Sequence, residues 1–236
     1  QGFLFGRNSV SGAINMITAK PDLDTSGGYV ELDAGERGVM VFEGALNIPT
    51  SDNFGIRLSG YYSEEDGYVE NLAGGPDLIS HDNAAVRLSA RYQNDKTTVD
   101  FMAEVEDRNQ FGTVYRATGG GFRQSEARAT SDDSVDPNGT AFDFHYDRMN
   151  GGPVAFSPDG RTVNNDNSLT PRDDSSIVSF QLSIEHDMDW ATFTSLTGFK
   201  DHEYDYVEDY DASPIILFNY GQDQEGDYFD QEFRLT

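Results

Sequence analysis

The residues best suited to hold a ligand are four tyrosines near the C-terminal end of the chain. Tyr204, Tyr206, Tyr210 and Tyr220 lie in a stretch that is rich in aspartate and glutamate. A tyrosine ring has an apolar face for stacking and a hydroxyl for hydrogen bonding, so such a group can bind a sugar or a siderophore, and nearby carboxylates can bind a cation. The same composition also fits a loop that only keeps the surface hydrated and borders a membrane.

The other reactive residue types form no motif with a known spacing. The acidic stretch 132–139 lacks the spacing and the distal glutamate of an EF-hand. The four histidines are far apart, no G-x-S-x-G elbow occurs, and cysteine is absent. We therefore predict no catalytic residues, no metal ligands and no cofactor.

Charge and hydropathy limit the possible partners and the fold class. The 236 residues carry a formal net charge of -26, and a polyanionic nucleic acid would be repelled by it. Only 36% of the residues are hydrophobic and the mean hydropathy is -0.59, so a large soluble core is not evident. No stretch approaches the ~20 apolar residues of a membrane helix.

Apolar and polar residues alternate with a period of two from about residue 22 onward. In 84–92, for example, Val86 and Leu88 alternate with Arg87 and Ser89. Such segments have about the length that a tilted strand needs to cross a bilayer. The other clear segments are 39–48, 54–62, 99–105, 178–185 and 229–235, while 29–34 is short and 190–199 is mixed. We count about eight strands.

The expected connections alternate between short and long. Links at 49–53, 93–96 and 186–189 suit tight hairpins, whereas 64–83, 111–174 and 201–225 are long and polar. Outer-membrane barrels have short periplasmic turns and long extracellular loops. The pattern therefore predicts an all-β, antiparallel transmembrane β-barrel. A soluble or secreted β-sandwich that binds carbohydrate is the alternative, because its strands also alternate.

The first twenty-one residues, QGFLFGRNSVSGAINMITAKP, support the barrel. Their motifs LFGRN at 4–8, GAIN at 12–15 and Lys20-Pro21 occur in the order seen where the plug domain of TonB-dependent outer-membrane receptors passes into the barrel. The chain resembles that family, and weaker similarities lie at 194–199 and 231–236. The resemblance implies that residues 1–21 are the end of a plug and that 22–236 begin the barrel.

Within this plug segment, four residues are candidates for structural roles. Gly6 and Gly12 permit backbone conformations that other residues avoid, and Asn8 suits a turn. Arg7 is either a hydrated turn residue or the group that holds the plug to the barrel through a carboxylate.

The resemblance also implies a function, namely uptake of a scarce nutrient across the outer membrane of a Gram-negative bacterium. Such receptors bind a small ligand, commonly a ferric siderophore or another iron complex, and the TonB complex supplies the energy. They transport the ligand without making or breaking covalent bonds, so the chain is not expected to be an enzyme. Its other partners would be outer-membrane lipid and lipopolysaccharide. Plugged transporters close with 22 strands, so this chain would be a fragment with about a third of the wall.

Overall fold

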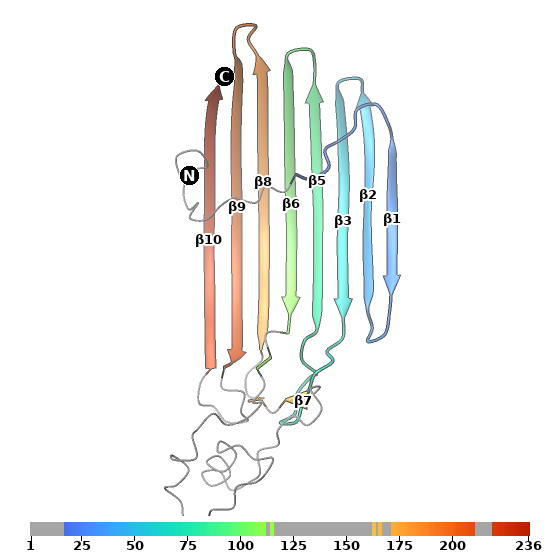
Figure 1. The fold of residues 1–236 in the computed structure, drawn as a ribbon, viewed down its shortest axis with the longest axis vertical. Coiled ribbons are helices and arrows are strands. Elements are labelled where there is room, and N and C mark those ends of the chain that lie inside the picture. Colours follow the sequence, from blue (N-terminus) through green and yellow to red (C-terminus); the bar gives the residue numbers. More distant parts are fainter. Residues whose placement is uncertain (1–16, 112–113, 116–161, 164, 167–170, 211–218) are drawn as a thin grey trace, which may run out of the picture.

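Eight long antiparallel strands form a single sheet (Figure 1). The computed structural model describes residues 17–111, 114–115, 162–163, 165–166, 171–210 and 219–236. Within these ranges there is no helix that is long and apolar enough to cross a membrane. In chain order the strands are β1 (Gly27–Ala34), β2 (Met40–Ser51), β3 (Phe54–Glu65), β4 (Glu70–Asn71), β5 (His81–Gln93), β6 (Thr97–Gln110), β7 (Thr162–Val163), β8 (Arg172–Asp187), β9 (Thr192–Asp209) and β10 (Asn219–Leu235).

The register places most of the apolar residues of the eight long strands on one face. Leu58 of β3 pairs with Leu46 on one side and with Leu88 on the other, and directly paired residues share a face. The same alignment continues through β6 and β8 to β10. We call this the apolar face. Its large residues that are well exposed are Val30, Leu32, Met40, Phe42, Leu46, Ile48, Phe54, Leu58, Val86, Leu88, Tyr92, Phe101, Val105, Val178, Phe180, Phe229, Phe233 and Leu235.

The apolar face forms a band of limited height. On β3 it runs from Phe54 to Tyr62, and on β8 from Ile184 to Val178. At ~3.3 Å per residue these runs are about 20 to 27 Å long. Acidic residues follow on the same face toward the long loops. The band therefore has roughly the height of the apolar belt of a membrane barrel, which is about 25 Å.

The opposite face, which we call the polar face, carries ion pairs between neighbouring strands. Arg87 of β5 pairs with Glu104 of β6, and Arg91 Nε lies 2.7 Å from Asp100 Oδ1. Because each pair joins two adjacent strands, these contacts add to the register that the backbone sets.

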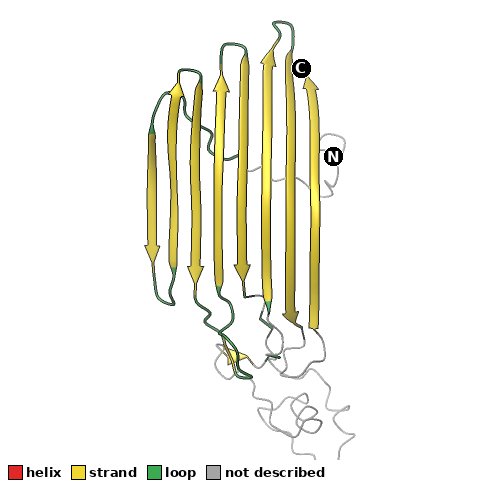
Figure 2. Cartoon of the chain, turned by 180° about the vertical axis from the view of Figure 1, so that it is seen from behind, coloured by secondary structure: helices red, strands yellow, loops and turns green. Residues whose placement is uncertain are grey.

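The connections differ between the two ends of the sheet as expected, except that the short β1–β2 turn lies at the end with the long connections (Figure 1). Short turns join β2 to β3, β5 to β6 and β8 to β9 at one end, and the long connections lie at the other (Figures 1 and 2). The expected loop at 201–225 was wrong in its bounds, since β9 continues to Asp209 and β10 begins at Asn219. Tyrosine favours strands, and backbone pairing overrides the acidic composition there.

The sheet is not closed. Strands β1 and β10 are its two edges, and Figure 2 shows them at opposite sides. The prediction of an all-β antiparallel architecture is confirmed, whereas closure into a barrel is not seen. No second sheet packs on the apolar face among the described residues, where the only other sheet pairs the two short strands β4 and β7.

Candidate functional site

Three of the four predicted tyrosines lie together on the polar face near the long loops. The rings of Tyr204 and Tyr206 on β9 stack with centroids 6.0 Å apart, and Tyr220 on β10 meets Tyr206 edge-on, also at 6.0 Å. His202 continues the row at 6.1 Å from Tyr204. We call Tyr204, Tyr206 and Tyr220 the tyrosine ladder, and it offers rings and hydroxyls to one side of the sheet.

The fourth tyrosine belongs to a neighbouring pair. Tyr210, which is exposed, contacts Tyr115 edge-on with the ring centroids 5.2 Å apart. Tyr115 was missed by the sequence prediction, because it lies in a long connection with no periodic pattern. The structure thus divides the predicted group into the ladder and this second pair.

Carboxylates surround the aromatic residues. Tyr206 donates its hydroxyl hydrogen bond to Glu208, which is buried. Asp173 lies beside Tyr204 and accepts a hydrogen bond from Arg108 Nη2 at 2.8 Å. The site therefore combines stacking surfaces with hydrogen-bond acceptors and carries negative charge.

The surroundings keep two of these phenols protonated. Burial raises the pKa of Tyr204 above its usual value, and the Asp173 carboxylate adds to the rise. Burial likewise raises the pKa of Tyr115, with a further contribution from Glu208. Both groups lie beyond the apolar band. At neutral pH both phenols are protonated and can donate hydrogen bonds.

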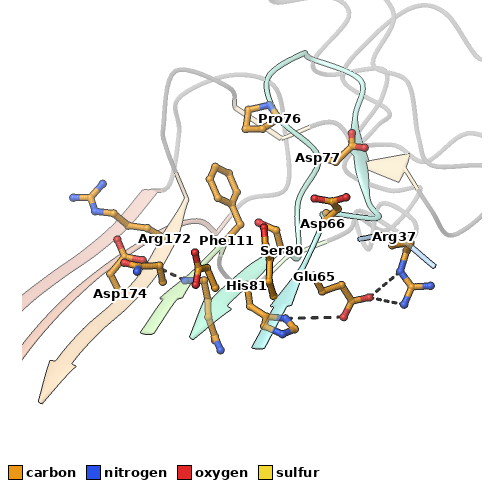
Figure 3. A pocket seen from close by; sticks show the side chains of 15 residues that line it. Arg37, Glu65, Asp66, Pro76, Asp77, Ser80, His81, Phe111, Arg172 and Asp174 are labelled. Atoms are coloured by element: carbon orange, nitrogen blue, oxygen red, sulfur yellow. Dashed lines mark hydrogen bonds and ion pairs between the residues drawn. The ribbon is translucent and has the colours of Figure 1, made fainter. Parts of the chain in front are cut away.

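A cavity of about 810 Å³ opens at the ends of β3, β5, β6 and β8 (Figure 3). Its volume suits a small ligand. Figure 3 shows the Arg37–Glu65 ion pair on one side, Arg172 and Asp174 on the other, and Phe111 between them. The remaining walls come from Glu64, Asp66, Gly67, Pro76, Asp77, Ser80, His81, Asp82, Asn109 and Gln110.

Negative charge dominates this cavity as well. Both of its arginines are neutralised by ion pairs, Arg37 with Glu65 and Arg172 with Asp205, the latter at 2.6 Å. Burial raises the pKa of Asp174, although the Gln110 backbone N–H, 3.3 Å away, opposes the rise. The carboxylates that remain favour an uncharged or cationic guest over an anionic one.

A small core in the long connections supports the rim of the sheet. Val69, Leu78 and Val163 are buried together. The Asn71 side chain binds the Asn165 backbone twice: its Nδ2 donates to Asn165 O and its Oδ1 accepts the Asn165 N–H, both at 3.0 Å. Residues far apart in sequence are therefore held together beside the cavity and the ladder.

One serine and one histidine approach each other in a way that the sequence did not indicate. Ser63 Oγ lies 2.8 Å from His81 Nε2, and Glu65 Oε2 is 4.0 Å from His81 Nδ1. Ser63 is buried in β3, which pairs with β2 on one side and β5 on the other. The backbone N–H groups next to Ser63 therefore donate hydrogen bonds to these neighbouring strands. Among the described residues, the backbone N–H groups beside Ser63 are thus not free to stabilise an oxyanion.

The plug candidates Gly6, Arg7, Asn8 and Gly12 lie outside the described residues. The described part of the same segment makes a contact of the type that was one of the two alternatives for Arg7. Lys20 Nζ lies 2.8 Å from Asp100 Oδ2 on the polar face. The sequence prediction missed this pair, because the two residues are 80 positions apart.

Comparisons with protein-family models, with curated proteins and with solved structures find no match for this chain.

Proposed function

We propose that this chain belongs to the wall of an outer-membrane receptor of the TonB-dependent type, which takes up a scarce nutrient such as a ferric siderophore or another iron complex. The TonB complex would drive uptake, and lipid and lipopolysaccharide would surround the wall. Residues 1–21 would be the end of the plug. The protein would transport its ligand and catalyse no reaction.

The observation that carries this proposal is the contrast between the two faces. Soluble monomers rarely expose a continuous apolar patch larger than a few hundred Å². Here seven of the eight long strands expose aliphatic and aromatic side chains together on one face, while charged pairs occupy the other. A lipid-facing wall with a polar interior has this arrangement.

The segment before β1 adds support. From Lys20, which contacts β6, to Asp22, which contacts β2, the chain crosses the polar face. A plug occupies the same side of a barrel wall. The two unpaired edges also suit a wall that continues with further strands, because an open edge is costly in lipid.

Lipid binding can be tested with the single tryptophan of the chain. Trp190 is 75% exposed and lies in the turn between β8 and β9, where an aromatic residue would meet the headgroups. We expect its emission to shift to shorter wavelength when the chain is refolded with phospholipid vesicles, and brominated lipids to quench it. Emission that stays unchanged at every lipid concentration would contradict the membrane assignment.

The charge around the tyrosine ladder predicts which iron complexes bind. A ferric tris-hydroxamate is uncharged, whereas a ferric tris-catecholate is an anion that Glu208 would repel, while Asp173 is already paired with Arg108. At about 1 kcal/mol per charge pair at close range in water, we expect the hydroxamate complex to bind at least about tenfold more tightly. Quenching of protein fluorescence measures both affinities. Preference for the catecholate would refute this interpretation of the ladder. If neither complex binds, iron complexes are excluded as ligands of this site.

The β-sandwich alternative has less support. A sandwich buries its apolar face against a second sheet, and the described residues place none there. A chain that stays monomeric without detergent or lipid would nevertheless favour it.

A further inference from the structure

The segment that crosses the polar face is attached at two points of different kinds. The first is Asn47, which is only 5% exposed. Its Oδ1 accepts the Asp22 backbone N–H at 2.9 Å, while its Nδ2 donates to the backbone oxygens of Asp22, at 2.9 Å, and of Thr25, at 2.7 Å. Both ends of the Asn47 amide are therefore used by the segment.

The same part of the segment is also fixed locally. Asp22 Oδ1 accepts the backbone N–H groups of Asp24 and Thr25 at 2.8 and 3.1 Å, which closes a turn. Pro21 is buried, and Leu23 lies over Gly55 so closely that an added Cβ would be 3.1 Å from Leu23 Cδ2. Residues 21–25 thus combine hydrogen bonds with packing.

The second attachment is the ion pair between Lys20 and Asp100. The Lys20 side chain is about half exposed, at 51%, and residues 17–20 are all exposed. Asp100 is bound independently by Arg91, whose Nε and Nη2 lie 2.7 and 2.9 Å from its two oxygens.

The two attachments differ in the state of the wall residues, Asp100 and Asn47, after each contact is lost. When Lys20 leaves, Asp100 keeps Arg91, so no charge is left unpaired, and an exposed ammonium returns to water. When Asp22 and Thr25 leave, the Asn47 amide loses all three of its hydrogen bonds and the packing of Pro21 and Leu23 is lost with them, which is unfavourable. The first contact is easily reversed and the second is not.

We propose that residues 17–25 form a two-part tether, in which 17–20 are a latch that releases and 21–25 are a root that stays on the wall. A pull from the N-terminal side then detaches the chain as far as Lys20 and stops at Pro21. This inference rests on the proposed function in one respect, because uptake would supply the pull. The positions of the two attachments do not depend on it.

Two substitutions separate the latch from the root in the refolded chain. In Asn47→Ala, we expect the Asp22 amide to exchange its hydrogen with deuterium at least tenfold faster. In Lys20→Met, we expect that rate to change less than about threefold, while a spin label at Ala19 becomes more mobile. Asn53→Ala is the matched control, since the Asn53 side-chain amide binds the Gln93 backbone oxygen of the neighbouring strand and not the segment.

A pair of glycine variants keeps the test valid if Asn47→Ala does not fold. Gly55→Ala presses on Leu23 and should accelerate exchange at Asp22, whereas Gly198→Ala has no atom within 4 Å of its added Cβ and should not. The proposal is overturned if Lys20→Met accelerates exchange at Asp22 as much as Asn47→Ala does, or if both Asn47→Ala and Gly55→Ala leave it unchanged. The exchange rates can be measured without transport or TonB. The tether proposal can therefore be refuted while the Trp190 experiment supports the proposed function, and it can be supported while that experiment contradicts the proposed function.

Discussion

Phe180→Arg is expected to prevent the chain from inserting into lipid, whereas Gln181→Arg is expected to be tolerated. The two residues are adjacent on β8 and point to opposite faces, Phe180 with 39% of its surface exposed on the apolar face. Arginine near the middle of a lipid-facing strand costs about 2 to 4 kcal/mol. On the polar face the same side chain stays in a polar environment, so the pair isolates which face meets the lipid.

The effect is measured by titrating vesicles into each unfolded variant and following the emission of Trp190. Phe180 also stacks on Phe199, with centroids 5.1 Å apart, so Phe180→Leu is needed as a third variant that removes this ring contact and keeps the site apolar. We expect Phe180→Leu to insert. Equal insertion of the two arginine variants would mean that protein, and not lipid, covers the apolar face.

Asp100→Ala is expected to have the second largest effect, a loss of about 2 kcal/mol in the free energy of unfolding. Its carboxylate binds both Arg91 and Lys20, and its removal leaves two like charges close together without a partner. Loss of one partner from a fully buried pair costs more than this, but these side chains are partly exposed. Lys20→Met should cost less than about 1 kcal/mol, because Asp100 keeps Arg91.

Urea titrations of the lipid-bound chain give both values, with Lys96→Met as the control. Lys96 forms a comparable pair with Asp189 at 2.6 Å, but both side chains are well exposed, and we expect little change there. A loss in Lys20→Met as large as that in Asp100→Ala would show that Arg91 does not compensate Asp100, and it would also weaken the distinction between latch and root.

Much of the sheet was predictable, because the pattern that builds it is local. Side chains alternate along a strand with a period of two, so the split of Val86 and Leu88 from Arg87 and Ser89 can be read without a structure. Short polar turns between such segments predicted hairpins in the same way. The stretch 201–225 was misjudged, because both of its faces are polar and the apolar alternation that marks a strand is absent.

The sites were less predictable, because they depend on which strands are neighbours and in which register. The tyrosines could be named in advance, but the contact of Tyr206 with Tyr220 requires the pairing of β9 with β10. Ser63 meets His81 only because β3 pairs with β5. The rim cavity draws on four strands, the β1–β2 turn and the connection between β3 and β5, and no single segment of the sequence contains it.

The amino-acid sequence by itself determined the strand type, the apolar and polar sides of the clearly alternating strands, and which end of the sheet has the long connections. Each of these follows from residues close together in the chain. Only the tertiary structure decided that the apolar sides align into one exposed face, that the sheet has two open edges, and that Lys20 and Asn47 fix the segment before β1. These depend on hydrogen bonds between distant residues, and a shift of one residue in register would move every such contact to the other face.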